Sequence, residues 1–151
     1  MTTQIYCTKA DIEAIWPAAS VLTSVDDDAN GTLSATEASY IDRAIERGAN
    51  FVNARLEMRY RLSDLATNTW CRDANAAIAA YWLSTRKGAA APAQLQQQYD
   101  AYVTALADIV LGRIKLPQQA ESFDITPGVS NFAIRMDEGY GRAERVDETS
   151  V

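Results

Sequence analysis

Between Ser34 and about Tyr60, apolar and small residues recur every three or four positions, as on one face of an α-helix. These residues are Ala38, Ile41, Ile45, Gly48, Val52 and Leu56. The opposite face is polar and carries Asp42, Arg43, Glu46, Arg47, Asn50 and Glu57. The pattern predicts one amphipathic helix of about 40 Å, at about 1.5 Å per residue. Gly48 is less favourable than Ala inside a helix by about 1 kcal/mol, so we expect a neighbouring helix to approach closely there.

Shorter helical patterns lie on both sides of this stretch. The segment Thr8–Asp11 has the spacing of a capping box and predicts a short helix, which Pro17 ends or kinks. Residues 18–25 fit either a further helical turn or a loop. Two strong helical patterns follow over 70–85 and 95–110, and each leads into a glycine that suits a helix C-terminus.

Together these patterns predict an all-α fold. The helices are joined by short connections, including a loop over 61–69, which favours antiparallel neighbours. We therefore expect residues 1–116 to form an antiparallel helical bundle around one long central helix.

The character of the chain changes after Lys115, and residues 117–151 show no helical period. Two short alternating runs, 123–125 and 132–136, flank a Pro-Gly turn and predict a small β-hairpin that is marginal by itself. We expect an extended C-terminal arm that contacts a partner; the alternatives are an arm that packs on its own bundle or one without fixed contacts. The residues expected to make the partner contact are the spaced aromatics Phe123, Phe132 and Tyr140.

Charge and composition exclude several functions. The net charge is −6, which argues against a general affinity for nucleic acid. The sequence has no histidine, which excludes Ser-His and Cys-His catalysis and His-ligated metal sites. It has no apolar run of membrane-spanning length and no signal-peptide pattern at its start, so we expect Cys7 and Cys71 to be reduced thiols in a cytoplasm-like compartment.

The polar loop before the long helix matches the EF-hand pattern for Ca²⁺. Oxygen-bearing residues fall at loop positions one, three, five, seven, nine and twelve, with Gly31 at the sharp turn of position six. These candidate ligands are Asp26, Asp28, Asn30, Thr32, Ser34 and Glu37. The alternative is structural, because Ser34 and Glu37 form a capping box by themselves and Asp- and Gly-rich turns are ordinary before helices. The loop occurs once, whereas EF-hands normally work in pairs, which favours the structural alternative. We expect no required cofactor. A structural Ca²⁺, if it binds, is expected to brace the loop and not to signal, because the sequence offers no Met-rich groove.

Two other groups of charged residues are candidate sites. The paired carboxylates of Asp11 and Glu13, or of Asp137 and Glu138, do not form any familiar catalytic constellation, so we expect no enzymatic activity. A cationic cluster surrounds Tyr60 near the end of the long helix. It is read either as compensation of the helix dipole with local salt bridges or as a subunit or partner contact through Arg55, Arg59, Tyr60 and Arg61.

Four segments in this order give the chain a resemblance to tailed-phage head–tail adaptor proteins, also called head-completion or connector proteins. They are Tyr6-Cys7-Thr8 with Asp11-Ile12; Ala44-Ile45 followed by Arg59-Tyr60; Ala76-Ala77-Ile78-Ala79 with Tyr81-Trp82-Leu83; and Gly112-Arg113-Ile114-Lys115-Leu116. The chain is most similar to the Mu-like group and more distantly similar to the HK97-like connectors. The similarity covers residues 5–116.

The resemblance implies a structural virion protein at the head–tail interface, assembled in the host cytoplasm. Such adaptors form a ring, expected to be a dodecamer, beneath the portal protein, and their C-terminal arm reaches into the portal. They extend the DNA channel and offer a docking surface to the tail or to a stopper protein. DNA passes through without specific binding, which an acidic wall favours, and no membrane is involved. The alternative from another class is a soluble Ca²⁺-binding module with a single EF-hand-like loop.

Overall fold

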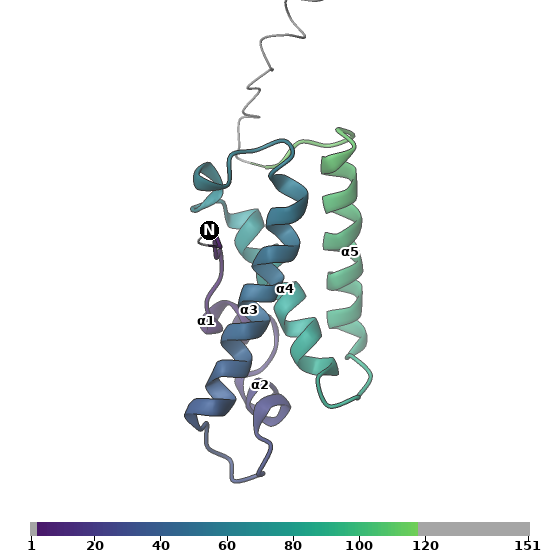
Figure 1. Ribbon diagram of the computed structural model, residues 1–151. Helices are drawn as coiled ribbons and strands as arrows, with labels where there is room; N and C mark the ends of the chain where they lie inside the picture. The colour runs from purple at the N-terminus through teal and green to yellow at the C-terminus, as the bar shows by residue number, and fades with distance from the viewer. Residues whose placement is uncertain (1–2, 118–151) are drawn as a thin grey trace, which may run out of the picture. The chain divides into compact units, whose positions relative to one another are not determined.

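The computed structural model describes residues 3–117, and every regular element in this range is helical (Figure 1). This confirms the all-α bundle for the part of the chain that is described. The elements are α1 (Lys9–Ile15), α2 (Ala18–Val25), α3 (Ala35–Leu56), the short 3₁₀ helix η1 (Leu62–Leu65), α4 (Thr69–Thr85) and α5 (Ala93–Val110).

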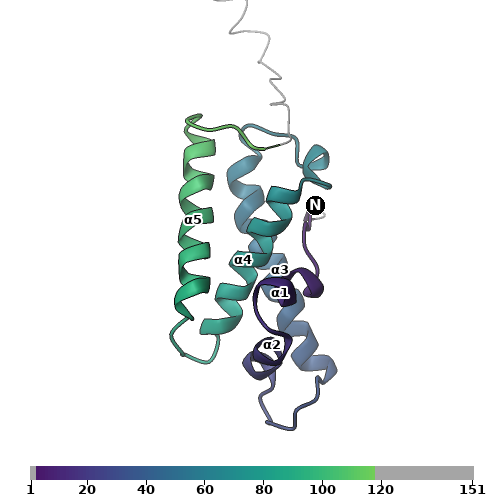
Figure 2. The same ribbon diagram turned by 180° about the vertical axis from the view of Figure 1, so that it is seen from behind.

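Three long helices run side by side in alternating directions, and the two short ones pack against them (Figures 1 and 2). The helix α3 is the longest, as expected, but α4 is the most deeply buried and contacts all four other α-helices. Its segment Ala74–Ala80 is buried on every side. Small alanine side chains let the neighbouring helices approach α4 closely from several directions, which is why its surface lacks a polar stripe.

The helix ends follow local signals, with one correction. The expected capping box of Thr8 and Asp11 opens α1, and residues 18–25, which fitted either a helix or a loop, form α2. The helix α3 ends at Leu56 and not near Tyr60, because the N–H groups of Arg59 and Tyr60 both donate to the Leu56 carbonyl in a tight turn.

That turn directs the Tyr60 ring into the core, where only 3% of the residue is exposed. The segment expected to be a loop over 61–69 contains the single turn η1, which buries Leu65.

Gly48 marks a close approach of α3 and α4, as its position in the long helix predicted. A Cβ built on Gly48 would lie 2.5 Å from Oδ1 of Asn75 and 3.1 Å from its backbone oxygen. Asn75 is fully buried, and its side-chain amide has no hydrogen-bond partner among the described residues. The crossing therefore depends on the missing side chain at Gly48.

The buried residues form two clusters along the bundle. One cluster is built on Ile12, Val25, Ile41 and Leu83, close to the loop before α3, and we call this the loop end. The other is built on Leu56, Tyr60, Leu106, Ile109 and Leu116, close to Pro117, and we call this the arm end. Each cluster contains one cysteine, Cys7 at the loop end and Cys71 at the arm end.

None of the described helices combines the length and apolar character needed to cross a lipid bilayer. The expected hairpin over 123–136 and the aromatics Phe123, Phe132 and Tyr140 lie outside the described residues.

Candidate functional site

The loop before α3 folds around the carboxylate of Asp26. This carboxylate accepts hydrogen bonds from the N–H of Gly31 at 2.8 Å and from the N–H of Asn30 at 3.2 Å. The backbone turns sharply because Gly31 and Ala29 both have left-handed φ angles, +74° and +55°. The glycine at the sixth position of the EF-hand pattern thus makes the turn that the pattern requires.

Three carboxyl groups of the predicted metal set converge in this loop. Oxygen atoms of Asp26, Asp28 and Glu37 all lie within 4.8 Å of one another. Glu37 is only 4% exposed, and its carboxylate accepts the N–H groups of Asp27 and Ser34, each at 2.8 Å. Hydrogen bonds from the Ser34 side chain and then from these two N–H groups lower the pKa of Glu37. The pKa of Asp26 is lowered chiefly by the N–H of Gly31.

The other predicted ligands are engaged within the chain. The side-chain oxygen of Asn30 accepts both the N–H and the hydroxyl of Thr32, at 2.7 and 2.6 Å. The hydroxyl of Ser34 accepts the N–H of Glu37 and caps α3. The carboxylate of Glu37 in turn accepts the N–H of Ser34. The expected capping box is therefore formed in full, and the loop keeps its shape through its own hydrogen bonds.

Two cations at the end of α4 hold the loop from outside. Arg86 donates to both carboxylate oxygens of Asp27, at 2.8 and 2.6 Å. Lys87 donates to the backbone oxygens of Thr23 and Asp26, at 3.0 and 2.5 Å. The sequence pattern at Arg86 and Lys87 indicates only a helix end, because the pairing with the loop joins residues that lie far apart in the chain.

At the arm end, buried hydrogen bonds fix the last described residues. The Tyr60 hydroxyl accepts the N–H of Leu116 at 3.1 Å, and Leu116 is only 2% exposed. The side chain of Asn68 accepts the N–H of Cys71 at 3.0 Å, which caps α4, and donates to the Pro117 carbonyl at 2.8 Å. We call Tyr60, Asn68 and Leu116 the exit clasp. It holds the chain at the point from which the arm continues.

The residues of the cationic cluster around Tyr60 lie in different environments. The Tyr60 ring lies in the core of its own chain and is not part of the exposed surface, and the expected subunit or partner contact of this cluster stays a prediction. Arg59 lies against Gly112, where an added Cβ would come within 2.5 Å of a guanidinium nitrogen. Arg55 is stacked over the Phe51 ring at 3.5 Å. Arg61 is exposed.

The arm end also exposes large apolar side chains that the sequence analysis missed. Met58 is 75% exposed, Leu111 63% and Ile114 44%. All three lie within four residues of a helix end, Met58 after α3 and the other two after α5, and the Arg59 side chain reaches from the first of these turns to Gly112 in the second. The available signal was their position in the turns beyond the last periodic residue of each helix, but that position does not distinguish them from Leu116, which lies further along the chain and is buried.

The two thiols are not candidates for chemistry. Burial raises the pKa of Cys7 and of Cys71 to about 12 in each case. Because the thiolate is the reactive form, both thiols are inert at neutral pH in the folded chain.

Comparison with known proteins gives one match. The family model described as Bacteriophage Mu, Gp36 matches residues 6–131. The matched range includes all five α-helices, the loop before α3 and the exit clasp. No curated protein and no solved structure matches the chain.

Proposed function

This chain belongs to the Bacteriophage Mu, Gp36 family, and on that basis we propose that it is a structural virion protein, a head–tail adaptor. In this role copies of the chain form a ring, expected to be a dodecamer, beneath the portal protein. The ring extends the DNA channel and offers a docking surface to the tail or a stopper protein. The protein acts by contact and not by catalysis, at the head–tail interface of the virion, after assembly in the host cytoplasm.

The observation that carries this proposal is the arm end. An adaptor must hold a connecting arm firmly and offer a contact surface beside it. The exit clasp buries Leu116 and binds the Pro117 carbonyl, and Met58, Leu111 and Ile114 stand exposed nearby. Large exposed apolar side chains at the same end of the bundle favour a protein contact there. The net charge of −6 supports a channel wall that DNA passes without binding.

Electron microscopy of the full chain mixed with purified heads that carry portals but no tails tests the proposal. We expect additional ring density at the portal vertex. A matched pair of variants sharpens the result: Leu111→Asp places a charge on the exposed apolar surface and should abolish the ring density, whereas Thr104→Asp, at an exposed position in the middle of α5, should retain it. Bare portals with the wild-type chain would refute the adaptor function.

The arm itself is tested by truncation. A chain ending at Pro117 keeps the whole exit clasp, so we expect a folded bundle that no longer docks on heads. A chain ending at Lys115 lacks Leu116 and should lose stability as well, because a buried leucine is removed. Full docking by the chain that ends at Pro117 would show that the arm is not the docking element.

A second candidate function is a structural Ca²⁺ site in the loop before α3. It is favoured by the convergence of Asp26, Asp28 and Glu37 within 4.8 Å and by the left-handed turn at Gly31. Oxygen ligands of this kind suit Ca²⁺, which takes six to eight oxygens. The loop is already braced by Ser34 and Arg86, so we propose a modest role in stability and not a signalling role.

Thermal unfolding with and without Ca²⁺ tests this second candidate. A ligand at about 100 times its dissociation constant stabilises the folded state by about 2.7 kcal/mol. We expect Ca²⁺ to raise the melting temperature of the wild type but not of Asp28→Asn. Mg²⁺ at equal concentration is the control for general screening of charge. Equal shifts with the two ions, or no shift, would refute the site.

A further inference from the structure

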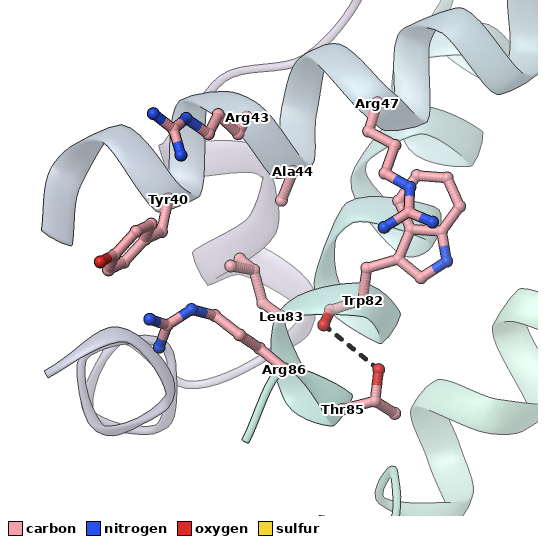
Figure 3. A pocket seen from close by; sticks show the side chains of 8 residues that line it. All are labelled: Tyr40, Arg43, Ala44, Arg47, Trp82, Leu83, Thr85 and Arg86. Carbon is pink, nitrogen blue, oxygen red and sulfur yellow. Dashed lines mark hydrogen bonds between the residues drawn. The ribbon is translucent and has the colours of Figure 1, made fainter. Parts of the chain in front are cut away.

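A pocket between α3 and the end of α4 gathers arginine and aromatic side chains (Figure 3). Its volume is about 400 Å³, within the usual range of about 300–1,000 Å³ for small-ligand sites. Arg43 and Arg47 line it from α3, and Trp82 and Arg86 line it from α4 and its end. No acidic residue is among the lining residues.

The charges in this pocket are not balanced within the described part of the chain. Arg86 is neutralised by the two-fold hydrogen bond to Asp27, and it lies over the Tyr40 ring at 3.9 Å. No carboxylate among the described residues pairs with Arg43 or Arg47. These two arginines are four residues apart on one helix, where like charges repel each other slightly. An incoming anion would remove that repulsion.

The position of Arg47 prepares it to bind a planar anion. Its guanidinium lies over the Trp82 ring, 4.4 Å from the ring centroid (Figure 3). Stacking on the ring leaves the N–H groups at the edge of the guanidinium free, and these match the two oxygens of a carboxylate. Because the stacked Arg47 side chain is already ordered, binding an anion costs it less conformational entropy than it would cost a mobile arginine.

We propose that this pocket receives a carboxylate side chain from a second copy of this chain, held by Arg43 and Arg47 and packed against Trp82. The inference rests on the proposed ring for the identity of its occupant. In a ring, a surface of one copy meets a different surface of the next, so the carboxylate comes from outside the pocket's own surface. Each copy has 20 Asp and Glu against 14 Lys and Arg, which supplies carboxylates in excess. Arginine, tryptophan and tyrosine are also the residues that most often anchor protein interfaces.

Zero-length cross-linking between isotopically distinct copies tests this contact. In the Arg43→Lys/Arg47→Lys variant, a carbodiimide joins a lysine amine directly to a carboxylate that lies against it. Equal amounts of ¹⁴N- and ¹⁵N-labelled full-length variant are treated in concentrated solution and on saturated tail-less heads, and cross-linked peptides are identified by mass spectrometry. The control is Arg72→Lys, because Arg72 lies 2.9 Å from Asp73 of its own copy and should give cross-links within single copies.

Cross-links from position 43 or 47 that combine light and heavy copies are the expected result, and they also identify the partner carboxylate. Cross-links confined to single copies, or none from these positions while position 72 reacts, would overturn the inference. Heads that take up the protein without mixed cross-links would refute this contact and leave the adaptor function standing. Mixed cross-links in solution together with bare heads would support this contact and refute the adaptor function.

The strength of self-association tests the same contact independently, in variants that have no lysine to cross-link at the pocket. Sedimentation of Arg43→Ala/Arg47→Ala should show association weaker by about tenfold or more, the effect of losing about 1.4 kcal/mol or more of charge-assisted contact. Arg72→Ala should match the wild type. Binding of a short DNA duplex that depends on Arg43 and Arg47 would instead assign the pocket to nucleic acid and overturn the inference.

Discussion

The loop end and the arm end of the bundle are held by different kinds of contact. At the loop end, Arg86 and Lys87 reach across the surface to the loop, and Asp27, which pairs with Arg86, is exposed. At the arm end, the exit clasp lies inside the protein, with Tyr60 and Leu116 each no more than 3% exposed. Charged contacts at a surface are weakened by salt and by a change of pH, whereas buried packing is not.

The two ends therefore differ in what can loosen them. The arm end is held by buried groups, which salt and pH affect little. The loop end is held by groups whose charge state depends on pH. Each core cluster contains one thiol whose labelling can measure local opening of that end, Cys71 for the arm end and Cys7 for the loop end. In chains with one cysteine replaced by Ala, the labelling rate of the other measures how often that end opens.

The largest effect should come from Leu116→Ala at the exit clasp. Removing this buried leucine should lower the free energy of unfolding by about 2–5 kcal/mol, measured by urea denaturation. The labelling of Cys71 should accelerate more than that of Cys7. Leu111→Ala is the control, since that leucine is 63% exposed and its loss should change stability by no more than about 0.5 kcal/mol. Equal acceleration of both thiols would mean that the two ends open together.

Asn68→Ala should have the next largest effect, because it removes the cap of α4 and leaves the Pro117 carbonyl without its donor. We expect a loss of about 1–3 kcal/mol in the free energy of unfolding. Asn68→Asp separates the two roles: its carboxylate can still accept the N–H of Cys71 but cannot donate to Pro117. The Asp variant should therefore keep most of the helix stability, which circular dichroism during urea unfolding would measure. If both variants behave alike, the bond to Pro117 does not matter.

Gly48→Ala tests the connection between the ends, since the Gly48–Asn75 crossing lies between the two clusters. Overpacking lowers the free energy of unfolding by about 1–3 kcal/mol, and the better helix propensity of Ala offsets about 1 kcal/mol of this. The net loss in the free energy of unfolding should therefore be up to about 2 kcal/mol. Both thiols should be labelled faster by similar factors. Adding Asn75→Ala removes the contact at 2.5 Å and an amide without a partner, so the double variant should recover stability. Strictly additive effects would argue against the close contact.

The smallest effect should be the response of the loop end to acid. The pKa values of Asp26, Asp27 and Glu37 are lowered in the folded chain, so the folded state binds fewer protons than the unfolded state at mildly acid pH. Their contribution is complete above the ordinary Glu pKa of 4.5 and is lost as the pH falls below it.

Glu37→Gln should therefore flatten the acid side of a plot of melting temperature against pH. Below pH 4.5, the labelling rate relative to that of a free thiol at the same pH should increase at Cys7 before Cys71 in the wild type. Earlier labelling of Cys71 would show that the arm end, and not the loop end, is sensitive to acid.

Much of the fold could be predicted from the sequence because the signals are local. The period of apolar residues located the long helices, the Thr8–Asp11 box located the start of α1, and Gly48 in an apolar face predicted a helix crossing. The six candidate ligand residues of the loop could also be recognised from the sequence, because all of them lie within one short segment. The last turn before Tyr60 was misassigned, because an apolar ring at helical spacing can continue a helix or turn into the core.

The sequence by itself determined the helices, their caps and the turn at Gly31, since each depends on residues within a few positions of one another. Only the tertiary structure decided how the ends are held and where the arginines gather. The bond from Leu116 to Tyr60 spans 56 residues, that from Asn68 to Pro117 spans 49, and that from Arg86 to Asp27 spans 59. No periodicity connects residues at such separations. They meet because the burial of apolar faces brings α3, α4 and α5 side by side, which places their connecting turns at common ends.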